Sequence, residues 1–104
     1  MQSETVSFRE ALLKGLAPDG GLYMPSAIPL LDRNTLLSLH ELEYHELAYT
    51  ILRHLTGYEI DEKVLYQLCR DAYDFDIPLE HVTDRRYIMR LDRGPTASFK
   101  DFAA

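Results

Sequence analysis

The sequence is organised around the alternating run Tyr87-Ile88-Met89-Arg90-Leu91 and the stretch Gly94-Pro95-Thr96-Ala97-Ser98-Phe99-Lys100-Asp101, which follows it two residues later. The alternation places Tyr87, Met89 and Leu91 on one face and predicts a short strand. Gly94-Pro95 ends this strand, and Thr96 or Ser98 is placed to cap a helix that begins near Phe99. The local pattern therefore predicts a strand, a turn and a helix.

Lys100 would lie in the first turn of that helix. The N-terminal end of a helix dipole is positive, so it disfavours the ammonium form of a lysine. Such an environment suits an amine that acts as a nucleophile. An ordinary surface lysine at a helix end is the alternative that this local pattern leaves open.

Length and composition predict one small acidic domain. The chain has 104 residues, of which 46% are hydrophobic and 27% charged, with a net charge of −6, and this is enough for one modest core. No basic cluster is present, so neither nucleic acid nor an anionic membrane is an expected partner. No apolar run approaches the ~20 residues that cross a bilayer. The single cysteine, Cys69, and the absence of a signal-peptide pattern predict a reducing, cytoplasmic location.

The first third of the chain predicts one helix and one turn. Ser7 and Glu10 have the spacing of a capping box, and Gly15 is placed to end the helix that they begin. Residues 18–21 then form a glycine-containing turn. Residues 22–24 follow in extended backbone and are predicted to pair with the strand at residues 87–91.

The middle of the chain predicts a helical pair. Asp32 or Asn34 caps a short helix that ends near residue 39. Apolar residues at helical spacing then predict a helix that Gly57 stops and a second helix that Asp61 caps. The residues at helical spacing in the first helix are Tyr44, Leu47, Ala48, Ile51, Leu52 and Leu55. The predicted buried stripe of the second helix is Leu65, Leu68, Cys69 and Ala72. The short connection predicts antiparallel packing. Residues 79–86 are interpreted as a polar connector, and the fold class is a small α+β domain that is mainly helical.

Other reactive residues have structural interpretations. His45-Glu46 begins like H-E-x-x-H, but Tyr49 stands where the second histidine ligand is needed, so no metal site is predicted. Cys69 falls on an apolar stripe, which indicates a buried structural thiol. The acidic residues between 71 and 80 lack the spacing and the glycine of a calcium loop. Gly20-Gly21 leads into extended backbone rather than a helix, which favours a tight turn over a phosphate-binding loop.

Several stretches, in this order along the chain, resemble the threonine synthase family. Residues 94–101 resemble the pattern G-P-T-x-x-F-K-D, which carries the cofactor lysine in that family. Residues 15–25 resemble its N-terminal pattern G-L-x-x-x-G-G-L-Y-x-P. Shorter likenesses at Val6-Ser7-Phe8 and at Tyr44-His45-Glu46-Leu47-Ala48 extend the resemblance over nearly the whole chain.

The resemblance implies a specific chemistry. Lys100 would bind pyridoxal 5′-phosphate (PLP) covalently and, once released by substrate, would move protons between the substrate's carbons. Phe99 and Asp101 would fix the direction of the lysine, while Gly94 and Thr96 would shape the turn and let the backbone approach the cofactor. The parent enzyme would convert O-phospho-L-homoserine and water to L-threonine and phosphate. The chain would be the N-terminal domain of a PLP-dependent enzyme with a tryptophan-synthase-β-like α/β fold.

The resemblance also implies boundaries and partners. Residues 1–92 would be the threonine synthase N-terminal domain, and residues 93–104 the start of the PLP-binding region. The expected partners are the C-terminal catalytic domains of the same chain and the substrate O-phosphohomoserine. Because a phosphate loop and a partner for the pyridine nitrogen are expected later in such a chain, this 104-residue piece is predicted to be inactive and to bind PLP weakly. Its uncovered apolar surface predicts self-association.

Two alternatives stay open. Asp92-Arg93 replaces the aromatic-histidine pair that often precedes G-P-T in the family. This difference leaves room for a threonine synthase-like phospho-lyase with another substrate. The other alternative is a non-catalytic helical docking or regulatory module that retains the motif.

Overall fold

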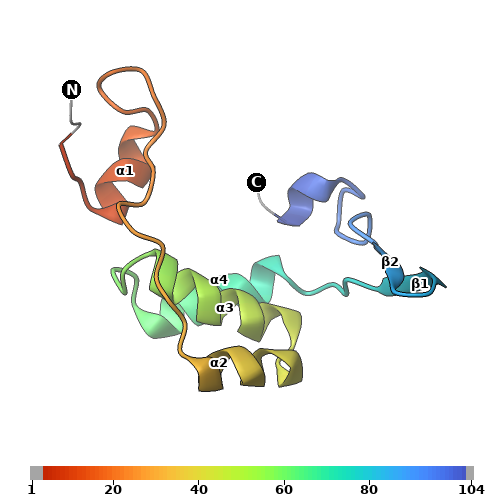
Figure 1. Ribbon diagram of the computed structural model, residues 1–104. Coiled ribbons are helices and arrows are strands. Elements are labelled where there is room, and N and C mark those ends of the chain that lie inside the picture. The colour runs from red at the N-terminus through yellow and green to blue at the C-terminus, as the bar shows by residue number, and fades with distance from the viewer. Residues whose placement is uncertain (1–3, 103–104) are drawn as a thin grey trace.

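The computed structural model describes residues 4–102, and in them helices precede a small hairpin (Figure 1). The elements are α1 (Phe8–Lys14), α2 (Arg33–Ser38), the 3-10 helix η1 (Leu39–Glu41), α3 (Tyr44–Leu55), α4 (Glu62–Ala72), β1 (Leu79–Thr83), β2 (Arg86–Met89) and the 3-10 helix η2 (Phe99–Phe102). The predicted class, a small and mainly helical α+β domain, is confirmed.

Side-chain caps begin three of the helices where the sequence predicts them. The Ser7 hydroxyl accepts a hydrogen bond from the Glu10 N–H at 3.1 Å, and Asp32 accepts one from the Thr35 N–H at 3.0 Å. Asp61 accepts hydrogen bonds from two amides in the first turn of α4. Each bond satisfies a backbone donor that has no partner inside the helix. These short-range signals are reliable because donor and acceptor lie within one turn of chain.

The helices α3 and α4 form the largest packed unit of the described residues. They lie side by side (Figure 1), and the connection at residues 56–61 reverses the chain between them. The core is smaller than predicted: Ala17, Leu65 and Cys69 are its buried apolar residues. Leu68 and Ala72, both predicted to be buried, are exposed, and the exposed fraction of Leu68 is 55%. That prediction was wrong because the face of α4 that carries Leu68 has no described element over it.

A carboxylate joins α1 to the helical pair. Glu59, in the connection between α3 and α4, accepts hydrogen bonds from the N–H groups of Phe8 at 2.9 Å and Arg9 at 3.1 Å. These amides are in the first turn of α1, where a negative charge is favoured. Gly15, with φ of 75°, ends α1 as predicted.

The turn after α1 closes on itself. An antiparallel bridge joins Leu16 to Leu22, and the Ala17 N–H donates to the Gly21 carbonyl at 2.9 Å. The prediction that residues 22–24 pair with the later strand was therefore wrong. Leu22 instead finds its backbone partner six positions earlier, since the tight turn at residues 18–21 brings the chain directly back.

The later strand pairs with a segment that the sequence analysis interpreted as a connector. β1 and β2 are antiparallel, with Leu79 opposite Met89 and His81 opposite Tyr87. The second strand spans residues 86–89 rather than 87–91. Every residue of the hairpin is exposed. Both faces of β1 carry polar residues. The alternation of apolar and polar residues that marks a half-buried strand is therefore missing.

The described chain is open rather than compact. Its accessible surface is 8799 Å², whereas a compact protein of this mass exposes about 6000 Å². The radius of gyration is 16.5 Å, against about 13 Å for a compact domain of this length. Leu13, Leu22, Met24, Ile28 and Leu30 are each at least three-quarters exposed, and Leu30 reaches 95%. Much apolar surface thus lacks a covering element among the described residues, and no helix there is long and apolar enough to cross a membrane.

Candidate functional site

The stretch that carries Lys100 forms a turn followed by η2. The Ala97 N–H donates to the Gly94 carbonyl at 3.1 Å and closes the turn. Ala97 has a φ of 57°, a left-handed conformation that residues other than glycine adopt rarely. The predicted helix at Phe99 is a 3-10 turn over the described residues, and Ser98 caps it by accepting a hydrogen bond from the Lys100 N–H at 3.2 Å.

Asp101 links the end of η2 back to the turn. Its carboxylate accepts hydrogen bonds from the Thr96 N–H at 3.0 Å and from the Thr96 hydroxyl at 2.6 Å. Gly94 lies against the same side chain: a Cβ on Gly94 would meet the Asp101 Cβ and Oδ2 at 2.5 Å. These contacts explain why the pattern has glycine, threonine and aspartate at these spacings. We call Gly94, Thr96 and Asp101 the turn clamp.

Lys100 lies between the clamp residues and is exposed. Its backbone N–H is bound to Ser98, while its side-chain amine has no hydrogen bond or ion pair to any of residues 4–102. Phe99 precedes it with 68% of its surface exposed. The turn clamp therefore fixes the backbone on both sides of Lys100 and leaves the amine available to a ligand.

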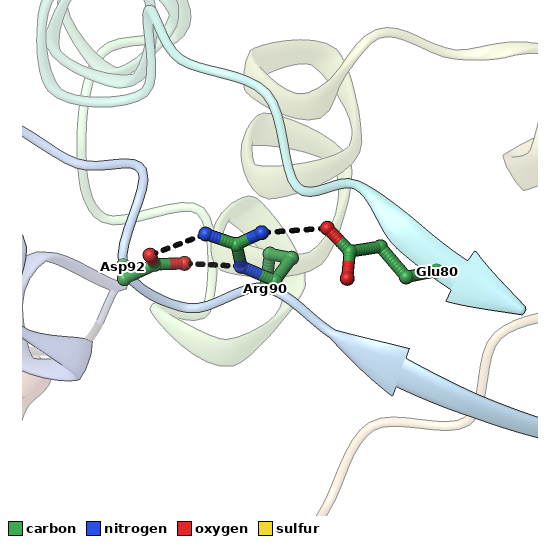
Figure 2. Close-up of polar contacts among 3 residues, drawn as sticks. All are labelled: Glu80, Arg90 and Asp92. Carbon is green, nitrogen blue, oxygen red and sulfur yellow. Dashed lines mark hydrogen bonds and ion pairs between the residues drawn. The ribbon is translucent and has the colours of Figure 1, made fainter. Parts of the chain in front are cut away.

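An arginine joins the hairpin to the approach of the turn (Figure 2). The Arg90 guanidinium donates from Nε at 2.8 Å and from NH2 at 2.6 Å to Asp92, and from NH1 at 2.6 Å to Glu80. The hydrogen bonds from Arg90 lower the pKa of Asp92 to about 2, and the two carboxylates raise the pKa of Arg90. Asp92, which departs from the family pattern, thus orients the chain as it leaves β2.

The Gly20-Gly21 turn is separate from this site. The Gly21 N–H donates to Asp19 Oδ1 at 2.9 Å, and the Gly20 N–H donates to the Ala17 carbonyl at 2.9 Å. Both glycine amides are therefore used within the turn rather than presented to an anion. Figure 1 shows this loop beside α1, away from η2.

These residues fit one part of a PLP site. A PLP site needs an amine, a phosphate-binding loop and a partner for the pyridine nitrogen. The exposed, unpaired Lys100 amine on a hydrogen-bonded turn meets the first need. His45, a half-buried histidine of α3, contacts Tyr66 and Glu43 instead of a site around Lys100.

Comparison with known proteins identifies the family. Residues 1–73 match the family described as the threonine synthase N terminus. This chain belongs to that family. The match stops before the boundary predicted after residue 92, so that boundary stays a prediction.

Whole threonine synthases extend the similarity through Lys100. The chain is 34% identical to threonine synthase from Pseudomonas aeruginosa, covering 98% of this chain and 23% of the relative. It is 38% identical to the Saccharomyces cerevisiae enzyme, covering 96% of this chain and 22% of the relative. The chain thus spans about a quarter of the length of these relatives and matches their N-terminal part.

Solved structures give the same result for the fold. PLP-bound threonine synthase from Brucella melitensis matches with a TM-score of 0.89 and 34% identity, over 96% of this chain and 23% of that one. Threonine synthase from Escherichia coli matches with a TM-score of 0.86 and 31% identity, over 93% and 23%. The open arrangement of helices and hairpin is therefore the one found in this region of threonine synthases.

Proposed function

We propose that this chain provides the N-terminal part and the cofactor lysine of a PLP-dependent threonine synthase. The reaction is the conversion of O-phospho-L-homoserine and water to L-threonine and phosphate. The single observation that carries the proposal is the exposed, unpaired Lys100 amine on the hydrogen-bonded turn. Membership of the threonine synthase family supports it, as does the PLP bound in a protein of the same fold.

Each residue of the site has a distinct role in this proposal. Bound PLP supplies an electron sink. Lys100 holds it covalently and moves protons at the substrate's carbons. Asp101 and Thr96 are hydrogen-bonded to each other, so their role is to hold the turn. Gly94 has no side chain and therefore allows Asp101 to approach the turn closely. Phe99, whose ring is exposed, would help to fix the direction of the lysine.

The remaining parts of the site would come from other residues of a longer chain. The relatives are about four times as long as this chain, and the exposed leucines of the open fold offer a surface for further domains. We infer that those domains are its partners and that O-phosphohomoserine is its small-molecule ligand. The 104-residue chain alone is expected to be inactive. The lone cysteine supports a cytoplasmic location.

Covalent trapping tests the proposal on the product of the complete natural gene. The protein is incubated with PLP and reduced with borohydride, and its peptides are mapped. The label is expected on Lys100, and Lys100→Ala is expected to abolish both the label and phosphate release. Lys63→Ala, which removes an exposed lysine from the first turn of α4, is the matched control and should change neither. A label on another lysine contradicts the proposal.

A second candidate is a threonine synthase-like phospho-lyase that acts on another phospho-amino acid. The observation that favours it is Asp92, which forms a fork with Arg90 where the family often has an aromatic-histidine pair. Phosphate release from O-phospho-L-homoserine and from O-phospho-L-serine separates the two candidates. Preference for phosphoserine would support the second, and label on Lys100 without turnover of either substrate would support a non-catalytic module.

A further inference from the structure

An aromatic cluster joins the turn that carries Lys100 to the helical pair. The Phe102 ring lies 5.2 Å from the Phe75 ring at 84° and 6.0 Å from the Tyr44 ring at 38°. Tyr44 in turn lies 4.7 Å from Tyr73. All three separations lie in the range of favourable ring pairs, and the Phe75–Phe102 pair has the edge-to-face geometry. The cluster combines the start of α3, the residue after α4, the segment that follows it, and η2.

Hydrogen bonds do not provide this connection. Within residues 4–102, every hydrogen bond made by residues 94–102 closes within that segment. The turn clamp makes the segment rigid internally, but it does not place the segment on the rest of the protein. The ring contacts of this segment to other elements among the described residues come from Phe102.

The two sides of η2 have different environments. Lys100 is exposed, whereas Asp101 and Phe102 are partly buried. A 3-10 helix has about three residues per turn, so neighbouring side chains leave it in different directions. One side of η2 thus docks on the aromatic cluster while another presents the amine. Burial and the neighbouring Tyr73 raise the pKa of Tyr44, as expected for a phenol in this cluster.

We propose that Phe102 is a positioning residue for the Lys100 amine, because its docking on Tyr44 and Phe75 fixes where η2 presents that amine. The proposal rests on the function proposed above for Lys100. It assigns the α3–α4 pair a role in that function: the pair is the platform against which the cofactor lysine is placed. A displacement of about 1 Å can cost roughly 100-fold in rate, so a contact that holds the backbone two residues from Lys100 is expected to affect the rate.

The first arm of the test needs no cofactor and uses the 104-residue chain. Nuclear Overhauser effects between the ring protons of Phe102 and those of Phe75 are expected. In Phe102→Ala the amide signals of residues 96–101 are expected to shift or broaden, while those of α4 stay in place. Absence of the ring contacts in the unsubstituted chain, or unchanged amide signals in Phe102→Ala, would overturn the positioning proposal.

The second arm uses the complete natural gene product with PLP. Phe102→Ala is expected to lower kcat by roughly 10- to 100-fold while KM changes less, and to shift the visible absorbance of the bound cofactor. Phe102→Tyr keeps the ring and should keep both kcat and the visible absorbance close to those of the unsubstituted protein. Tyr87→Ala, which removes an exposed ring from β2, is the matched control and should leave both unchanged. A kcat per folded molecule of Phe102→Ala that equals the kcat of the unsubstituted protein would overturn the proposal.

The two proposals fail in different ways. Borohydride label on a lysine other than Lys100 would reject the proposed function, and the ring contacts in the first arm would still be measured independently. Label on Lys100 with equal kcat in Phe102→Ala and the unsubstituted protein would reject only the positioning role. The two results therefore cannot be confused.

Discussion

The Asp101 carboxylate accepts two hydrogen bonds from Thr96, one from its backbone N–H at 3.0 Å and one from its hydroxyl at 2.6 Å. This bidentate contact brackets Lys100 on the chain without using the lysine side chain. It gives a physical reason for the spacing between the threonine and the aspartate of the motif. The bonds to a charged carboxylate are stronger than those between neutral groups.

Removing the carboxylate should release the turn. Asp101→Ala is expected to raise the hydrogen-exchange rate of the Thr96 amide by at least about tenfold, since a bond to a charged group contributes about 1.5–3 kcal/mol. Thr96→Val should have a smaller effect, because it removes only the hydroxyl. Thr96→Ser keeps both donors and is the matched control. Equal exchange rates in Asp101→Ala and the unsubstituted chain would contradict the observed bond.

Gly94 should not tolerate a side chain. Gly94→Ala places a Cβ at 2.5 Å from both Cβ and Oδ2 of Asp101, and overpacking of this kind costs about 1–3 kcal/mol. The turn is expected to open, which heteronuclear NMR of residues 94–101 would detect. Gly21→Ala is the control, because the nearest contact of its Cβ would be the Asp19 carboxylate at 3.1 Å, which is a longer distance. Unchanged NMR signals of residues 94–101 in Gly94→Ala would contradict the close approach of Gly94 and Asp101.

Asp92 should stay ionised in moderate acid. Its pKa is lowered from 3.8 to about 2 by the hydrogen bonds from Arg90. The stabilisation from this contact is therefore fully present above about pH 4 and is lost as the pH falls through about 2. A carboxyl-carbon NMR titration of Asp92 should show a midpoint near 2, and Arg90→Gln should move it up toward 3.8. A midpoint near 3.8 with Arg90 present would refute the fork in Figure 2.

The exposed apolar surface should cause the 104-residue chain to associate. Leu30, at 95% exposure, and Leu22, at 75%, offer apolar area to a second molecule. Light scattering over a dilution series is expected to show an apparent mass that rises with concentration. Leu22→Glu with Leu30→Glu should reduce this rise, and it should cost little stability because both sites are exposed.

The control for association adds the same charge at polar positions. Asn34→Glu with Gln67→Glu changes the net charge equally and leaves the apolar surface intact, so association should persist. A monomer at every concentration of the unsubstituted chain would show that this surface does not drive self-association. Equal loss of association in both double variants would point to charge rather than apolar contact.

The residue pattern was sufficient to place the N-terminal caps of three helices. Ser7, Asp32 and Asp61 cap where the sequence predicts, and Gly15 and Gly57 adopt positive φ at helix ends. A cap joins groups three residues apart, so its signal is contained in a few letters of sequence. The start of α3 was harder, because Glu43 and Glu46 form a reciprocal capping box with a glutamate in the capping position.

The hairpin and the site required the structure. β1 carries no alternation, because both of its faces are exposed, so its pairing with β2 could not be predicted from its own residues. The sequence singled out Gly94, Thr96 and Asp101 through a resemblance, but it did not show that Asp101 binds Thr96 and excludes a side chain at Gly94. Those contacts depend on the turn at Ala97 folding the segment back on itself.

By itself, the sequence determined the N-terminal caps of three helices, the mainly helical class and the lysine on which the proposed chemistry depends. These are properties of short segments, where neighbouring residues supply both donor and acceptor. Only the tertiary structure decided that Leu22 pairs with Leu16, that residues 79–83 form a strand, and that Phe102 meets Tyr44 and Phe75. The two strand pairings are local, but each depends on a turn whose closure the strand residues do not specify. The ring contacts of Phe102 join residues distant in sequence, and their free energy is gained only after the intervening chain has closed.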